Sequence, residues 1–193
     1  MRHPILYAEQ VWRRQRFFVL ILVVFATGMV LVLAANRRFN DPSLPFYVLY
    51  LAVALLIFGG FQVNRLRSYV QVVDGGLKVS RLVRSAVIGY DNIRAVRVQS
   101  LRTVMQDMPR RTVTPAMKDL LDKPALLVRL DGGPEEIAAI TRRLNSTLGT
   151  RLVFDSTAAF PVKDPAAVVA ELTPHLPIRA QANLGGARRK RRR

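Results

Sequence analysis

Two apolar runs near the start of the chain constrain its fold more than any other feature. Residues 17–35 and residues 46–63 contain 19 and 18 residues, and none of these is Asp, Glu, Lys, Arg or His. At about 1.5 Å of rise per residue, a helix of either length covers a hydrocarbon core about 30 Å thick. A helix also satisfies its own backbone hydrogen bonds where water is absent. The sequence therefore predicts an integral membrane protein with a transmembrane helical hairpin.

The first run has a second interpretation, which is a cleaved signal peptide. Arg13, Arg14 and Arg16 precede it, as basic residues precede such a segment, and residues 33–35 weakly resemble a cleavage site. The run is nevertheless longer than the apolar core of a signal peptide, which has about 7 to 15 residues. The second run also follows after only ten residues. We therefore favour the hairpin.

Basic residues around the hairpin predict its orientation. Those on the outer sides of the two runs are Arg2, Arg13, Arg14, Arg16, Arg65 and Arg67. The connecting loop holds Arg37 and Arg38. Because cytoplasmic flanks carry the excess of Lys and Arg, both termini are predicted to be cytoplasmic and the loop to lie outside. Residues 1–16 are predicted as a basic leader, either an amphipathic helix on the inner leaflet or a flexible segment.

Residues 64–177 are predicted to form a polar, strand-rich domain. Alternating apolar residues in 69–73 and 77–82 flank Gly75 and Gly76, and this is a β-hairpin signal because glycine tolerates positive φ. Further strands are predicted at residues 86–88, 93–101, 125–130, 151–154 and 158–162. Residues 102–123 are predicted as a long connection with one helical turn near its end.

Two helices are predicted within this domain. The first begins at Pro134, and Glu135 and Glu136 then lie at the positive end of the helix dipole. The second begins after Asp164, which is a good capping residue, and ends near Leu172. The order of elements predicts an α+β fold, in which a small antiparallel β-barrel or sandwich follows the hairpin and is capped by a C-terminal helix.

Three stretches of the domain resemble the PH-like domain of bacterial two-span membrane proteins. They are residues 69–82 (YVQVVDGGLKVSRL), 88–96 (IGYDNIRAV) and 160–172 (FPVKDPAAVVAEL). In that family a glycine hairpin opens the domain, and a strand ending in Asp-Pro leads into the closing helix. The resemblance covers residues 68–174 and implies a cytoplasmic PH-like domain in a multi-pass protein of the bacterial inner (plasma) membrane. It implies an adaptor or scaffold and no enzymatic activity. The helix predicted at residues 134–148 departs from the family's seven-strand order.

The sequence contains no recognisable catalytic, metal-binding or cofactor-binding motif. Cysteine is absent, which excludes disulfides, thiolate metal ligands and cysteine nucleophiles. His3 and His175 have no suitably spaced partners for a metal site or a catalytic triad. Glu135 and Glu136 are adjacent, so they do not share a helix face. We therefore expect a protein that is not an enzyme and has no cofactor.

The chain ends in a polybasic tail. Its residues are Arg188, Arg189, Lys190, Arg191, Arg192 and Arg193. Because such a run repels itself, residues 178–193 are predicted to be disordered. Each basic residue near an anionic leaflet contributes about 1 kcal/mol of attraction, so contact with anionic lipids is the favoured role. Binding to nucleic-acid phosphates, through this tail alone, and a solubilising tail without a partner are the alternatives.

A second basic group is predicted within the domain. Its members are Arg81, Arg84, Arg94, Arg97, Arg102, Arg110 and Arg111. They form either one face that binds lipid headgroups or an acidic partner, or a solvated sheet face, which is the simpler interpretation.

The formal net charge of the 193-residue chain is +17, which favours anionic partners. We expect a non-enzymatic adaptor or scaffold whose cytoplasmic domain binds a protein partner or the membrane surface. The alternative is an accessory subunit of a membrane transport or envelope-assembly complex.

Overall fold

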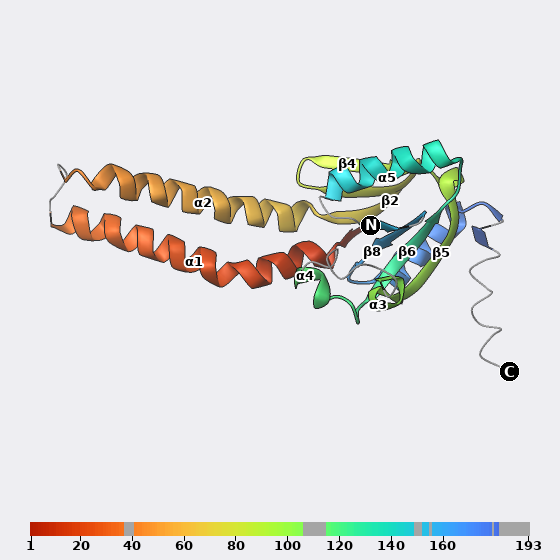
Figure 1. The fold of residues 1–193 in the computed structure, drawn as a ribbon, viewed down its shortest axis with the longest axis horizontal. Coiled ribbons are helices and arrows are strands. Elements are labelled where there is room, and N and C mark those ends of the chain that lie inside the picture. The colour runs from red at the N-terminus through yellow and green to blue at the C-terminus, as the bar shows by residue number, and fades with distance from the viewer. Residues whose placement is uncertain (37–40, 106–114, 149–151, 155, 179, 182–193) are drawn as a thin grey trace. The chain divides into compact units, whose positions relative to one another are not determined.

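The computed structural model describes residues 1–36, 41–105, 115–148, 152–154, 156–178 and 180–181 (Figure 1). The chain divides into two compact units. One unit is Ala8–Leu66, and the other combines Met1–Tyr7 with Arg67–Arg193. We call the first the helical unit and the second the polar unit.

The helical unit contains most of two long helices, α1 (Leu6–Ala35) and α2 (Leu44–Arg67). Both are long and apolar enough to cross a membrane. Only 11% and 6% of their most apolar stretches are buried, so neither serves as the core helix of a soluble domain. Side chains such as Phe17 and Leu56, which are 64% and 75% exposed, need an apolar environment. The two helices contain the two apolar runs at residues 17–35 and 46–63.

Aromatic side chains join α1 and α2 near the ends that connect to the polar unit. The ring of Trp12 lies 5.5 Å from the ring of Phe58, edge to face, and 6.4 Å from the ring of Phe61. Such pairs stabilise beyond the area they bury. Because α1 begins at Leu6, most of the segment expected to be a separate leader belongs to this helix.

The first sheet of the polar unit has the order β1-β2-β3-β4 and is antiparallel throughout. Its strands are β1 (Arg2–Pro4), β2 (Tyr69–Val73), β3 (Gly76–Arg81) and β4 (Arg84–Ile88). Val70 pairs with Val79, and Val79 with Ala86, so these three apolar side chains form one cross-strand row. All three are buried, as expected for one face of an alternating sheet.

The first residues of the chain form a strand in this sheet, within the segment predicted as a basic leader (residues 1–16). His3 pairs with Val70 in β2. The Ile5 amide donates to the carbonyl of Ser68 at 3.1 Å, and the Leu6 amide donates to the carbonyl of Pro161 at 2.8 Å. The three residues of β1 are too few to give a periodic signal, and their partners are more than sixty residues away in the sequence.

The second sheet has the order β5-β6-β8-β7 and is also antiparallel. Its strands are β5 (Ile93–Ser100), β6 (Pro124–Leu130), β7 (Val153–Phe154) and β8 (Thr157–Phe160). Val96 pairs with Val128, and Val128 with Ala158, and all three are fully buried. This face of the sheet packs into the same hydrophobic core as the buried row of the first sheet.

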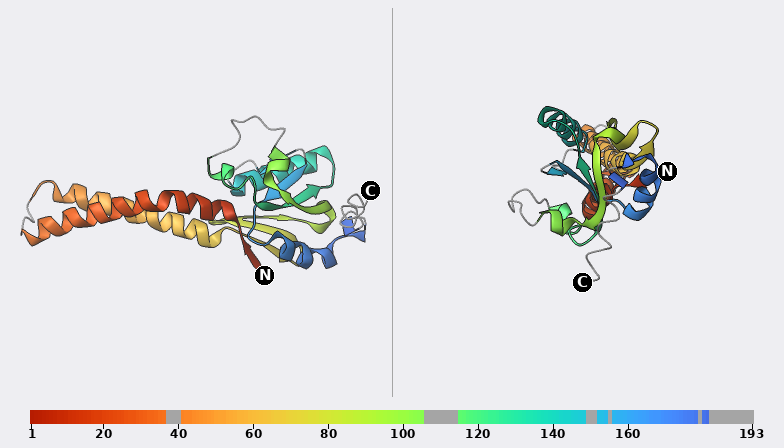
Figure 2. Two further views of the ribbon diagram at one scale, coloured as in Figure 1. Left: turned by 90° about the horizontal axis from the view of Figure 1, so that it is seen from below. Right: turned by 90° about the vertical axis from the view of Figure 1, so that its right-hand side faces the viewer.

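Helices complete the polar unit (Figures 1 and 2). They are α3 (Leu101–Met105), α4 (Pro115–Lys118), α5 (Pro134–Leu148) and α6 (Pro165–Leu172), with 3₁₀ turns η1 (Tyr90–Asn92) and η3 (Thr173–His175). Both longer helices contact both sheets: α5 contacts β3 and β4 of the first and β7 of the second, and α6 contacts β2 of the first and β5 and β6 of the second. Val168 and Leu172 of α6 are fully buried.

The α+β architecture with a closing C-terminal helix is confirmed, but the expected barrel is not. Each sheet has four strands and two open edges, and neither closes on itself. One closed barrel would require pairing between β4 and β5 and also between β1 and β7, and neither pair is hydrogen-bonded in the described part of the chain. The two sheets instead share a core as a sandwich.

Candidate functional site

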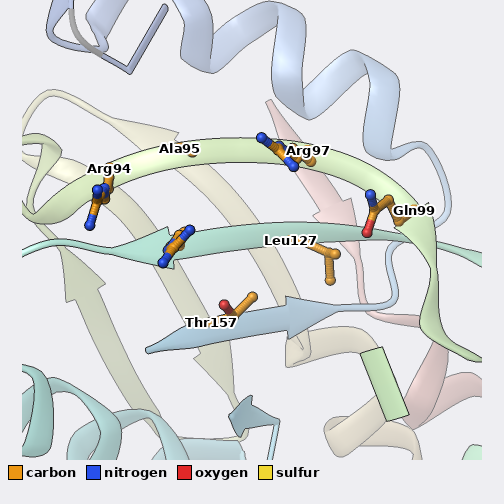
Figure 3. Close-up of a pocket in the computed structure, with 7 residues that line it drawn as sticks. Arg94, Ala95, Arg97, Gln99, Leu127 and Thr157 are labelled. Carbon is orange, nitrogen blue, oxygen red and sulfur yellow. The ribbon is translucent and has the colours of Figure 1, made fainter. Parts of the chain in front are cut away.

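Arginine side chains gather on the outer face of the second sheet (Figure 3). In the strand register Ala95 lies opposite Arg129, and Arg97 lies opposite Leu127. Residues two apart on a strand share a face, so Arg97 and Arg129 belong to the same surface. The register shifts between Ile93 and Ala95, and this bulge adds Arg94 to that surface.

These arginines line a hollow of about 330 Å³, which we call the arginine hollow. Its residues are Arg94, Ala95, Arg97, Gln99, Leu127, Arg129 and Thr157. Figure 3 shows Arg94 and Arg97 along β5, Thr157 on β8 and Leu127 on the strand between them. The buried side chains of Ala95 and Leu127, 6% and 7% exposed, form its apolar part. None of the lining residues is acidic.

Two arginines of the hollow, Arg97 and Arg129, add positive charge that no described side chain neutralises. Within the described ranges, neither Arg97 nor Arg129 makes an ion pair or hydrogen bond through its side chain. A guanidinium presents a planar fork of donors that fits carboxylate and phosphate oxygens in a bidentate manner. Gln99 and Thr157 add neutral donors beside it. The arrangement is therefore suited to bind an anionic group.

Arg81 and Arg84, also expected on the basic face, lie instead on the first sheet. They pair with each other across the β3–β4 hairpin. The Arg81 guanidinium lies 5.9 Å from the ring of Tyr7, and burial lowers the pKa of Arg81 while Tyr7 partly opposes this shift. Arg84 Nη1 donates to the carbonyl and the hydroxyl of Ser146, at 3.1 and 3.2 Å.

The remaining predicted basic residues do not join the arginine hollow within the described structure. Arg102 donates to both carboxylate oxygens of Asp122, at 2.8 and 2.9 Å, so its charge is matched locally. Arg110 and Arg111 lie outside the described residues, as do the tail residues Arg188, Arg189, Lys190, Arg191, Arg192 and Arg193. Sequence reasoning grouped Arg94 with Arg97 but missed Arg129, because only the strand register places it beside them.

The two histidines have structural surroundings. His3 is buried, and its Nε2 lies 3.3 Å from Glu171 Oε1 in a geometry that is electrostatic rather than a directed hydrogen bond. His175 stacks on Tyr90 at 5.3 Å. Burial of Tyr90, helped by the charge of Asp74, raises the pKa of this phenol. Among the residues with described positions, no group of three His, Asp or Glu is arranged to hold a metal ion.

Comparison with protein-family models, with curated proteins and with solved structures gave no match to this chain. The resemblance to PH-like proteins therefore stays a prediction. The geometry of the arginine hollow and the apolar surface of α1 and α2 are the observations on which a function is proposed.

Proposed function

We propose that this protein is a non-enzymatic adaptor, anchored in a bacterial inner membrane by α1 and α2. Its PH-like polar unit lies on the cytoplasmic side and binds an acidic segment of a protein partner at the arginine hollow. The polybasic tail adds attraction to anionic lipids of the same leaflet. The observation that carries this proposal is a concave sheet surface with three arginines and no acidic lining residue.

The energetics of the arginine hollow favour a ligand. Arg97 and Arg129 carry like charges on adjacent strands and on the same face, and like-charge pairs on a sheet are destabilising. A carboxylate from a partner removes this repulsion and gains charge-assisted hydrogen bonds, each worth about 1.5–3 kcal/mol. The apolar floor formed by Ala95 and Leu127 lowers the local dielectric and strengthens these contacts.

The helical unit supports the anchoring role. α1 and α2 have 30 and 24 residues, and large apolar side chains are exposed along both. The arginines on the outer flanks of the two apolar runs outnumber those in the connecting loop, and this favours cytoplasmic termini. An anchored adaptor needs only a stable attachment to the bilayer, which two spans supply.

Site-specific photocrosslinking in cells tests this proposal. A benzoylphenylalanine at Thr157 places the crosslinker in the arginine hollow, and one at Glu135 places it on the exposed surface of α5 as a control. We expect a discrete protein adduct from position 157, absent from position 135, in which the crosslinked peptide is acidic. Substitution of Arg97 and Arg129 by Gln should remove the adduct. An adduct that survives this change would contradict the proposal.

One feature favours a second candidate, an accessory subunit of a larger membrane complex. The apolar side chains of α1 and α2 are exposed around most of each helix, so other membrane helices can pack on them. Exchange of residues 17–63 for an unrelated two-span hairpin separates the two functions. An adaptor keeps its partner after the exchange, whereas a subunit held through its spans loses it in mild detergent.

A further inference from the structure

The hairpin that joins β3 and β4 has an apolar tip. Arg81 pairs with Arg84, so the turn consists of the two residues Leu82 and Val83. Leu82 is 40% exposed and Val83 is 86% exposed. Two-residue hairpin turns favour Asn and Gly because positive φ is required, yet Leu82 adopts a φ of 54°. The turn thus exposes two large apolar residues at positions where hairpin turns usually have small or polar residues.

Strand pairing places this tip at the same end of the first sheet as the residues whose chain leads into α1 and comes from α2. Pro4 pairs with Tyr69, and Tyr69 pairs with Ser80. α1 begins two residues after Pro4, and α2 ends two residues before Tyr69. Two residues of chain span at most about 7 Å. The Leu82–Val83 turn follows Ser80 by the same short interval, so it belongs to the sheet end from which both helices depart.

We propose that the Leu82–Val83 tip inserts into the interfacial layer of the membrane that α1 and α2 span. This inference rests on the membrane anchoring in the proposed function, and it assigns a site separate from the arginine hollow. The tip is amphipathic, since Val83 is 86% exposed and two arginines, Arg81 and Arg84, flank the turn. Apolar side chains then reach the acyl boundary, and the arginines contact lipid phosphates.

The neighbouring contacts hold the tip in position. Arg84 is fastened by two hydrogen bonds to Ser146 near the end of α5, and Arg81 lies over the ring of Tyr7. A second hollow of about 360 Å³ is lined by Arg81, Leu82, Val83, Arg84, Ser146 and Thr147. Arg84 uses only Nη1 for its bonds to Ser146, so the other N–H groups of its guanidinium remain for a phosphate oxygen. A lipid headgroup would bind in this hollow, beside the inserted tip.

Depth measurement by fluorescence tests the proposal on the full chain in liposomes. The chain has no cysteine, so Val83→Cys accepts a single environment-sensitive dye. Val87→Cys is the matched control, because Val87 is an exposed valine on the same strand, four residues from the tip. In vesicles of phosphatidylcholine and phosphatidylglycerol we expect a blue shift and quenching by lipid-borne nitroxide at position 83. At position 87 we expect quenching by aqueous iodide. Iodide quenching at both positions would overturn the proposal.

A second variant removes the apolar tip while keeping the turn. Leu82→Gly with Val83→Asn places glycine at the position with positive φ, so the melting temperature should stay the same or rise. A dye at Ser85→Cys then reports the depth of the hairpin. We expect nitroxide quenching at position 85 to fall in the Gly-Asn variant. Unchanged quenching would show that the two side chains do not insert.

Alkaline extraction of the same liposomes separates this inference from the anchoring on which it rests. If the protein stays with the vesicles while the dye at position 83 is aqueous, the tip proposal fails and anchoring stands. If the protein is stripped from the vesicles, both fail.

Discussion

Gly76 lies directly against the main chain of Ile88, the last residue of β4. Gly76 has a φ of 142°, and a Cβ built on it would lie 2.8 Å from the carbonyl carbon of Ile88, closer than real Cβ contacts come. The glycine hairpin that opens the polar unit is therefore required both by backbone conformation and by the close approach of another strand.

Replacement of Gly76 by Ala should lower the free energy of unfolding of the polar unit by about 2–4 kcal/mol, since backbone strain and overpacking each cost about 1–3 kcal/mol. Gly75→Ala is the control, because no heavy atom lies within 4 Å of a Cβ at that position. Its effect should stay within about 0.5 kcal/mol. Denaturant unfolding in detergent, followed by circular dichroism, measures both. Equal stability of the two variants would show that Gly76 can relax away from Ile88.

The cap of α6 predicts a second stability change. Asp164 Oδ1 accepts from the amide of Ala167 at 3.0 Å, and Pro165 occupies the first turn. Asp164→Ala should cost about 0.5–2 kcal/mol, whereas Asp164→Asn should be nearly neutral, because asparagine caps about as well as aspartate. Thermal unfolding of the two variants distinguishes a capping role from a role of the negative charge. A large loss in the Asn variant would contradict capping.

Without a bound anion, the arginine hollow should lower the stability of the folded polar unit. We expect substitution of Arg97 and Arg129 by Gln to leave the melting temperature unchanged or raise it, because like-charge repulsion is relieved. Polyglutamate should raise the melting temperature of the wild type by binding the folded state, and this rise should shrink in the variant.

Arg142 and Arg143 supply the matched control for this experiment. Both are exposed on α5, away from the arginine hollow, and their replacement by Gln removes the same charge. The control variant should respond to polyglutamate as the wild type does. An equal loss of response in both variants would attribute the binding to net charge rather than to the hollow.

Glu171 predicts a pH dependence. Partial burial acts to raise the pKa of Glu171, but His3 and the amino group of Met1, each 3.3 Å from a carboxylate oxygen, outweigh it and hold the pKa below its usual value. The folded state then binds fewer protons than the unfolded state. Its stabilisation is complete above about pH 4.3, the unfolded pKa of a glutamate, and is lost as the pH falls through the lower folded value.

Glu171→Gln should therefore lower the melting temperature at neutral pH. The difference from the wild type should close as the medium is acidified below the folded pKa. A pH-independent gap between wild type and the Glu171 variant would assign the effect to packing rather than to charge.

Local patterns in the sequence accounted for most elements of the polar unit. The alternation of residues 69–82 predicted β2 and β3, and Pro134 and Asp164 marked the starts of α5 and α6. These elements depend on signals within a few residues, namely strand periodicity, turn glycines and helix caps. Such signals can be recognised in a single sequence, and tertiary packing did not change the elements that they predicted.

Features that depend on distant pairing could not be predicted. β1 needs the exposed edge of β2, and Arg129 joins Arg94 and Arg97 only through the register of β5 with β6. The turn at Leu82 was missed for a different reason, because leucine gives no signal for a left-handed conformation. The candidate site thus lies where the local sequence carries least information.

Single-cysteine labelling of intact cells with an impermeant thiol reagent tests the central claim most directly. The chain has no cysteine, so each signal belongs to the introduced site. Ser43→Cys lies at the α1–α2 connection, Ser156→Cys lies in the polar unit, and Ala187→Cys precedes the polybasic tail. A membrane-anchored adaptor with a cytoplasmic polar unit predicts labelling at position 43 alone. Labelling at positions 156 and 187, with none at 43, would invert the topology and contradict the account.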